Sequence, residues 1–200
     1  GAITPILTYP WLSGLDLDAD GTTAYTSSPN GVITIDLTTT PATSTIVSSW
    51  QAMDLALDEA HQRIILAGAI TLNSLVAVDL VTGEIVSATS VVTDMGDWET
   101  VALDVSADGS SLVALKGRTY NTGYGSEVIE YDLTDLPPLP SPNANDWADE
   151  WSEVRHFALP AYPTDLRIGR DSRELYLANA GSGECVERLG PDGTVLEPVP

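Results

Sequence analysis

The chain has 200 residues, enough for one domain with a substantial core, and its apolar fraction of 43% is typical of a folded protein. Its 29 acidic and 8 basic residues give a formal net charge of −21, which argues against nucleic acid and anionic membrane surfaces as partners. The single cysteine excludes an intrachain disulfide and a cysteine-rich zinc cluster, and no apolar run is long enough to span a membrane.

The first well-defined predicted element is the segment LDLDADG at Leu15–Gly21. Its alternating aspartates Asp16, Asp18 and Asp20, followed by glycine, match the first half of a calcium-binding loop. The late acidic ligand of such a loop is missing, because Ser27 occupies its position. An Asp-Gly pair between apolar runs is also a strong hairpin signal. We therefore favour a strand and tight turn, with calcium ligation as the alternative.

The same strand–turn–strand pattern returns three times along the chain, at Leu55–His61, Leu103–Gly109 and Leu166–Ser172. Each copy leads into a second apolar run, then a third run that ends in a polar turn, and then a fourth. Helical periodicity is almost absent. Each repeat is therefore predicted to be four short strands separated by turns.

Four-stranded units that recur about every 40 to 60 residues are typical of β-propeller blades. We predict an all-β propeller of about four blades, either a closed small ring or part of a larger one. It forms a single domain over residues 1–200, with an insertion at 136–153. The approximate repeats are 13–48, 52–92, 101–159 and 164–198. One further strand-like run, Ile6–Tyr9, resembles the last strand of a preceding unit.

Two segments carry a resemblance to known families. SPNGVITIDLTT (Ser28–Thr39) and NSLVAVDLVTGEIV (Asn73–Val86) resemble the YVTN and LVIVD types of bacterial propeller repeat. The resemblance covers nearly the whole chain through short motifs and implies the propeller fold. Such repeats occur in surface proteins, in scaffolds and in proteins with catalytic sites, so the resemblance implies no particular chemistry.

Large aromatic residues precede each predicted innermost strand, where propeller loops surround one mouth of the central channel. Carboxylates lie close to them in the sequence. Aromatic walls with a few carboxylates suit a sugar, a cation or a cationic side chain. The alternative is that the aromatic residues pack between blades as core. The candidate ligand-binding residues are Trp11, Trp50, Trp98, Tyr162, Asp54, Asp97, Glu99 and Asp165.

The segment DWETVALDVSADG (Asp97–Gly109) resembles part of the phytase-like propellers, in which acidic residues near the channel hold calcium. That resemblance implies Asp97 and Glu99 as metal ligands, beside the alternative set at Asp16, Asp18 and Asp20. No cofactor is required by the sequence, and calcium is the possible exception. No catalytic residue is predicted, because neither histidine adjoins a serine motif and no glycine-rich phosphate loop precedes a helix.

The leading functional prediction is a non-enzymatic recognition or scaffold domain that binds a protein, carbohydrate or other small ligand at the channel mouth. One alternative is a metal-dependent hydrolase or lactonase that uses channel carboxylates. Another is a calcium-stabilised structural module. We expect an extracellular, cell-surface or periplasmic location, no membrane insertion, and possible self-association that completes the ring.

Overall fold

The structure is a computed structural model that describes residues 11–69, 74–90, 98–118, 126–139, 151–159, 163–169, 174–179, 185–190, 193–194 and 196. In these residues the chain forms antiparallel sheets in chain order, and each sheet is one blade. Blade 1 contains β1 (Ser13–Leu17), β2 (Thr23–Ser28), β3 (Gly31–Asp36) and β4 (Thr43–Ser48). Blade 2 contains β5 (Asp54–Asp58), β6 (Arg63–Ala67), β7 (Ser74–Asp79) and β8 (Ile85–Ser90), with the 3₁₀ turn η1 (Glu59–His61) after β5.

The two remaining blades follow the same order. Blade 3 contains β9 (Trp98–Val105), β10 (Ser111–Arg118), β11 (Ser126–Asp132) and β12 (Glu153–Leu159). Blade 4 contains three strands in its described part, β13 (Pro163–Ile168), β14 (Leu175–Asn179) and β15 (Cys185–Leu189).

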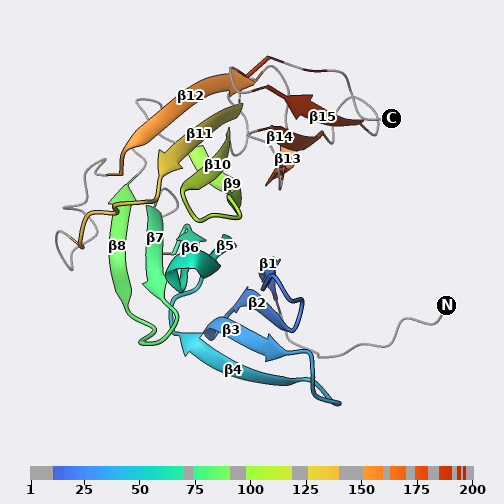
Figure 1. The fold of residues 1–200 in the computed structure, drawn as a ribbon, viewed down its shortest axis with the longest axis vertical. Helices are drawn as coiled ribbons and strands as arrows, with labels where there is room; N and C mark the ends of the chain where they lie inside the picture. The colour runs from blue at the N-terminus through green and yellow to red at the C-terminus, as the bar shows by residue number, and fades with distance from the viewer. Residues whose placement is uncertain are drawn as a thin grey trace.

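The blades are arranged around a common axis, as Figure 1 shows. The first strand of each blade lies innermost, and β4, β8 and β12 lie on the outside (Figure 1). The inner strands β1, β5, β9 and β13 contact one another in chain order. In the part of the chain that the structure describes, β13 and β1 make no comparable contact. The predicted strand Ile6–Tyr9 lies outside the described residues. The predicted all-β propeller of about four blades is confirmed.

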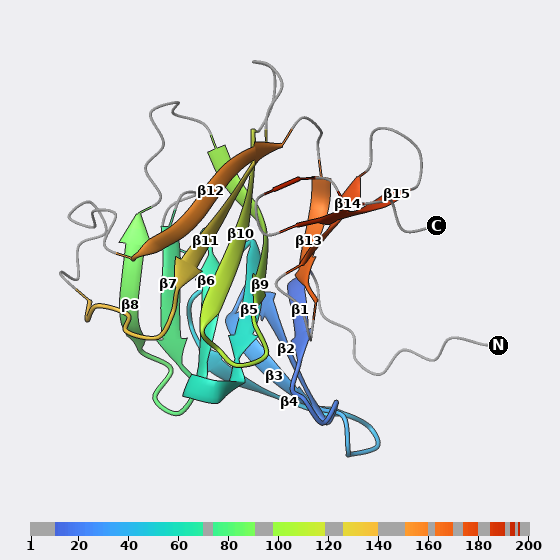
Figure 2. The same cartoon turned by 45° about the horizontal axis from the view of Figure 1, so that its top comes forward.

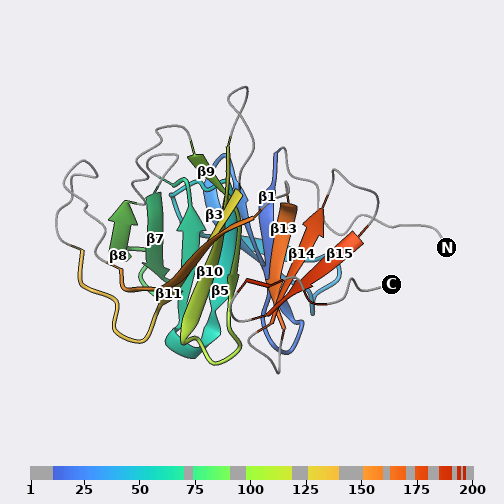
Figure 3. The ribbon, with the colours of Figure 1, turned by 90° about the horizontal axis from the view of Figure 1, so that it is seen from above.

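Apolar clusters between neighbouring blades form the core. Blade 2 is covered on both faces, so β6 and β7 are continuous apolar runs rather than alternating ones. One face of blade 2, with Leu55 and Leu66, packs with Val32 of blade 1. The opposite face, with Ile65, packs against blade 3. Figures 2 and 3 show the sheets standing side by side in this way.

An aspartate ends the third strand of each of the first three blades and shapes the following turn. Asp36 accepts hydrogen bonds from the backbone and hydroxyl of Thr38, and Asp132 does the same with Thr134. Asp79 accepts from the backbone and hydroxyl of Thr82. These hydrogen bonds hold the pKa of all three carboxyls below the usual value. The Asp of the repeat motif therefore has a structural role.

The two described ends of the predicted insertion pack against blades 2 and 3. Trp151 is buried in the cluster between them, lies edge-on to Tyr131 at 6.1 Å between ring centroids, and donates its indole N–H to Ser87 Oγ at 2.9 Å. Ser87 in turn donates to the carbonyl of Pro137 at 2.5 Å. The insertion is thus held to β8 at both ends.

Candidate functional site

Aspartates on the inner strands join neighbouring blades through backbone hydrogen bonds. Asp16 on β1 accepts from the N–H of Leu57 on β5 at 2.8 Å, and Asp54 on β5 accepts from the N–H of Leu103 on β9 at 2.8 Å. Asp104 on β9 accepts from the N–H of Ile168 on β13 at 2.5 Å. Every described blade–blade junction contains one such bond. An edge strand leaves alternate N–H groups unpaired, and these carboxylates satisfy some of them.

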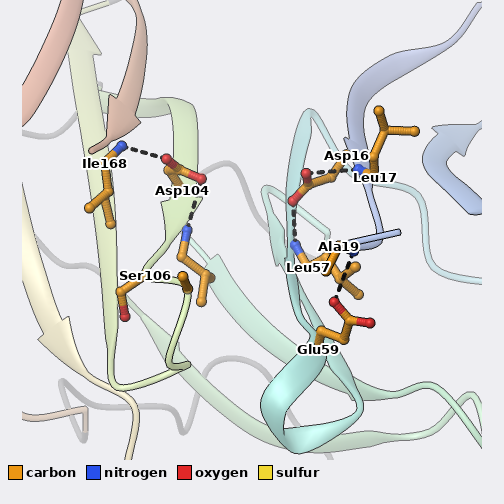
Figure 4. Close-up of a pocket in the computed structure, with 10 residues that line it drawn as sticks. Asp16, Leu17, Ala19, Leu57, Glu59, Asp104, Ser106 and Ile168 are labelled. Carbon is orange, nitrogen blue, oxygen red and sulfur yellow. Dashed lines mark hydrogen bonds between the residues drawn. The ribbon is translucent and has the colours of Figure 1, made fainter. Parts of the chain in front are cut away.

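Two of these aspartates line a pocket of about 390 Å³ at the end of the channel where the inner strands finish (Figure 4). The residue after Asp16 on β1 and the residue after Asp104 on β9 are both aliphatic. The aligned positions on β5 and β13 are aliphatic as well. Equivalent positions of the four repeats therefore converge on one pocket. These four side chains are Leu17, Leu57, Val105 and Ile168.

The remaining lining of the pocket comes from three blades and contains acidic but no basic side chains among the described residues. Glu59 of η1 contributes a carboxylate and accepts a hydrogen bond from the backbone N–H of Ala19 at 3.0 Å. Ser106 and Ala107 close the side formed by blade 3. Figure 4 shows Asp16 and Glu59 on one side and Asp104 on the other. The pocket thus combines a ring of four aliphatic side chains with negatively charged carboxylates around that ring.

Burial raises the pKa of Asp104 from its usual 3.8 to about 6. The hydrogen bond from Ile168 and the positive charge of Arg167 partly offset this effect, whereas the negative charge of Asp16 adds to it. A positive charge placed in the pocket would favour the ionised form of Asp104.

The other two aspartates of the candidate calcium loop do not line this pocket. Asp18 accepts hydrogen bonds from the backbone of Thr22 and Thr23 and from the Thr22 hydroxyl, at 2.7, 3.0 and 2.8 Å. These bonds lower the pKa of Asp18 to about 2. Asp20 is exposed at the tip of the same turn. Among the described residues no group of three or more His, Cys, Asp or Glu side chains could hold a metal ion. Calcium binding stays a prediction.

The predicted aromatic mouth lies at the other end of the inner strands, where they begin. Trp11 is 86% exposed and Trp50 is partly exposed, so neither is part of the core between blades. The carboxylate of Asp54 belongs to a blade junction, and that of Asp165 accepts from the N–H of Leu166 at 2.8 Å. Asp97 and Tyr162 lie outside the described residues, as do the side chains of Trp98 and Glu99. The aromatic site stays a prediction.

The pocket residues Leu17, Leu57, Val105, Ile168, Glu59, Asp104 and Ser106 are absent from the predicted site. A signal for four of them was present, because the aliphatic residues mark the same position in each repeat. Identical positions of propeller repeats lie at the same height around the axis. Glu59 gave no such signal, since only the fold brings η1 beside the end of β1.

No family model and no curated protein sequence matches the chain. Assignment to the YVTN or LVIVD type therefore stays a prediction. Among solved structures, the chain is similar to the dihydro-heme d1 dehydrogenase NirN in complex with DHE, with a TM-score of 0.57 and 18% identity. It is also similar to a chain of a mitotic checkpoint complex, with a TM-score of 0.53 and 9% identity.

The alignments with these two structures cover 94% and 95% of this chain but only 37% and 65% of the respective neighbours. At these identities the likeness supports the propeller fold and nothing finer. No helix in the described part of the chain is long and apolar enough to cross a membrane.

Proposed function

We propose that this propeller is a recognition domain that binds a small organic cation with an aliphatic body. The binding site is the pocket at the end of the channel where the inner strands finish. The observation that carries this proposal is the convergence of four equivalent aliphatic side chains and the carboxylates of Asp16, Glu59 and Asp104 on one cavity. The volume of about 390 Å³ lies in the range of small-molecule sites.

The composition of the pocket supports this ligand class. An ammonium or guanidinium group would pair with carboxylates that no basic lining residue already neutralises. Its methylene groups would contact Leu17 and Leu57, for which removal from water is favourable. Asp16 and Asp104 are fixed by backbone hydrogen bonds, so ordering them on binding costs little entropy.

The propeller fold fits a binding or scaffold role. One structural neighbour is described in complex with the small molecule DHE, and the other belongs to a multiprotein complex. These descriptions concern those proteins, and the fold by itself carries no function. We therefore rest the proposal on the pocket of this chain.

The test is calorimetric titration with three probes of similar shape: n-hexylammonium, hexan-1-ol and hexanoate. We expect binding of the ammonium alone, because only it is attracted by the carboxylates. Glu59→Gln should weaken that binding by roughly 2- to 5-fold, the usual effect of one exposed charge pair. Asp135→Asn is the matched control, since Asp135 is exposed and outside the pocket.

Two results would contradict the proposal. Equal binding of the alcohol and the ammonium would show an apolar cavity without charge recognition. An equal loss in the Asp135→Asn control would show that only the net charge of −21 attracts the cation. Titration at 0.05 and 0.5 M KCl adds a second check, because a diffuse attraction weakens with salt far more than a contact within the pocket does.

A further inference from the structure

The residue that precedes each member of the aliphatic ring of the pocket differs from blade to blade. It is Asp16 in blade 1 and Asp104 in blade 3, but Ala56 in blade 2 and Arg167 in blade 4. A carboxylate is therefore present at this level in two alternate blades and absent from the blade between them. Because β5 contacts both β1 and β9, the two aspartates lie on either side of it.

The carboxylates of the pocket form two separate acidic ends. Figure 4 shows Asp16 and Glu59 on one side of the cavity and Asp104 on the other. Glu59 belongs to the Asp16 end, because its side chain accepts from the N–H of Ala19 in the turn after β1. Besides burial, which is the main cause, the negative charge of Asp16 raises the pKa of Asp104. The two ends are therefore close enough to interact across the cavity.

Both ends can still accept hydrogen bonds from a ligand. Each oxygen of Asp16 and Asp104 accepts one backbone N–H of an inner strand, at 2.5 to 3.1 Å. A carboxylate oxygen has two lone pairs, so each of these oxygens can accept one more hydrogen bond. Among the described residues, Glu59 accepts through one of its oxygens only. The backbone bonds also hold the two aspartates in place before a ligand arrives.

Arg167 offsets only part of the negative charge near Asp104. Its guanidinium donates to the carbonyls of Leu103 and Leu166 at 3.2 and 3.3 Å, and lies 3.9 Å from the carboxylate of Asp165. Its positive charge is therefore shared with Asp165, and its side chain does not line the pocket. Asp104 remains the acidic group of its end of the cavity.

We propose that the ligand of this pocket carries two ammonium groups at the ends of an aliphatic chain, one bound by Asp16 and Glu59 and the other by Asp104. The inference rests on the proposed function, because it specifies the cation that the same pocket binds. A ligand with one charge leaves one acidic end without a counterion, whereas an α,ω-diamine neutralises both. Its methylene groups contact the aliphatic ring.

A divalent metal ion carries the same charge but fits this geometry less well. A metal ion holds its oxygen ligands within about 2.6 Å, so the carboxylates would have to converge on one point. Asp16 and Asp104 instead lie on opposite sides of the cavity (Figure 4). Among the described side chains, no group of three or more His, Cys, Asp or Glu could hold a metal ion. The two charges of the ligand are therefore separated by a chain.

The test compares 1,6-diaminohexane with n-hexylammonium by calorimetric titration of the whole chain at pH 7. The two probes have the same six-carbon chain and differ in the second ammonium. We expect the diamine to bind at least about fivefold more tightly, because that ammonium donates charge-assisted hydrogen bonds to a partly buried carboxylate. Equal affinities would overturn this inference and leave the proposed function intact. No binding of either probe would overturn both.

Chain length separates bridging of the two ends from general attraction of a dication to a protein of net charge −21. The series runs from 1,3-diaminopropane to 1,8-diaminooctane, each diamine being compared with the monoamine of equal length. We expect the advantage of the diamine to peak at one length, because a shorter chain cannot span both ends and a longer one lowers the effective concentration of its second ammonium. An advantage that does not depend on length would overturn the proposal.

Asp104→Asn tests which carboxylate binds the second ammonium. The advantage of the diamine should fall to about twofold or less, because only the statistical benefit of two identical ends remains. Asp135→Asn changes the charge equally at an exposed site outside the pocket and should keep the full advantage. Lowering the pH from 7 to 5 should also reduce the advantage in wild type, since Asp104, whose pKa is about 6, becomes protonated. A full advantage in Asp104→Asn would overturn the proposal.

Discussion

The aspartates of the segment Leu15–Gly21 have separate structural roles at the scale of single residues. Asp16 joins β1 to β5 and lines the pocket, whereas Asp18 closes the hairpin turn. Their counterparts in blade 3 are Asp104 and Ser106, and they divide these roles in the same way, since Asp104 reaches β13 and the Ser106 hydroxyl accepts from the N–H of Ser111 across the turn. The alternation that resembles a calcium loop therefore also follows from strand geometry, which places a junction residue and a turn residue two positions apart.

Asp104 should make the protein less stable as the pH rises from 4 to 6. Its folded-state pKa of about 6 lies above the usual 3.8, so the folded state retains a proton that the unfolded state has lost. The resulting stabilisation is fully present below pH 4 and is lost as the pH rises through 6, by roughly 2–3 kcal/mol. Asp104→Asn keeps an acceptor for Ile168 and should flatten this decline in urea unfolding at pH 4.5, 5.5 and 6.5.

Some decline should remain in Asp104→Asn, because burial also raises the pKa of Asp54. Asp108→Asn is the control. Hydrogen bonds from Ser110 and Ser106 lower the pKa of Asp108 to about 2, so its stabilisation is present above pH 4 and is lost only as the pH falls toward 2. This variant should keep the wild-type decline between pH 4.5 and 6.5. An equal decline in Asp104→Asn and wild type would refute the assignment.

Asp58 should be among the residues most sensitive to substitution. It is fully buried, accepts from Arg63 Nε at 2.6 Å, and caps η1 through the N–H of His61 at 3.3 Å. Arg63 also donates to the carbonyl of Leu133 at 2.6 Å and so links blade 2 to blade 3. Asp58→Ala leaves a partly buried guanidinium without its carboxylate and should lower the free energy of unfolding by about 3 kcal/mol.

The measurement for Asp58→Ala is urea unfolding at pH 7, with Asp135→Ala as the control at an exposed acid. Asp135→Ala should change the free energy of unfolding by less than about 0.5 kcal/mol. A loss below about 1 kcal/mol in Asp58→Ala would mean that the Arg63 bond to Leu133 holds the junction without the carboxylate.

At the scale of the element, the two Ala-Asp-Gly turns offer a matched comparison. Gly21 and Gly109 both have positive φ, of 67° and 70°. A methyl group at Gly21 meets nothing within 4 Å, whereas at Gly109 it would collide with the Asp58 carboxylate and approach Ala60 and His61 at 2.9 Å. At Gly109 the turn of blade 3 packs against η1 of blade 2. At Gly21 the turn of blade 1 has no such neighbour.

Gly21→Ala should therefore cost about 1–2 kcal/mol of unfolding free energy, the price of the left-handed conformation for an L-residue. Gly109→Ala should cost that amount plus the displacement of Asp58 and His61, about 3 kcal/mol or more in total. Thermal unfolding of both variants beside wild type gives the comparison. Equal losses in the two variants would show that the blade 3 turn moves away from η1 without penalty.

The sequence identified elements better than it identified the site. Alternation and polar turn residues, including the Asp-Gly pairs after Leu17 and Val105, predicted the strands around Leu17, Leu57, Val105 and Ile168 because these signals are local. The pocket depends on where four distant inner strands end relative to one another, which local signals do not encode. The exposure of Trp11 and Trp50 depends equally on which blade lies beside them.

At the scale of the whole molecule, the net charge determines how stability depends on salt concentration. A net charge of −21 on 200 residues repels itself in the compact state, and salt screens that repulsion. Raising KCl from 0.05 to 1 M should therefore raise the melting temperature by about 5 °C or more, since the Debye length falls from more than 10 Å to about 3 Å. Only 8 basic residues face 29 acidic ones, and the ion pairs among the described residues include Arg63–Asp58 and Arg155–Glu130.

The same melting experiment separates this general effect from the calcium-stabilised module that the sequence also predicts. CaCl₂ and MgCl₂ at equal ionic strength should raise the melting temperature equally if the ions only screen charge. A specific calcium site would give a larger rise with CaCl₂, saturating at low concentration and removed by chelator. Asp97→Asn with Glu99→Gln, and separately Asp16→Asn, would then show which of the two predicted ligand sets is responsible. A melting temperature that is insensitive to KCl would mean instead that the carboxylates are spaced widely enough, or bind enough counterions, for their mutual repulsion to be negligible.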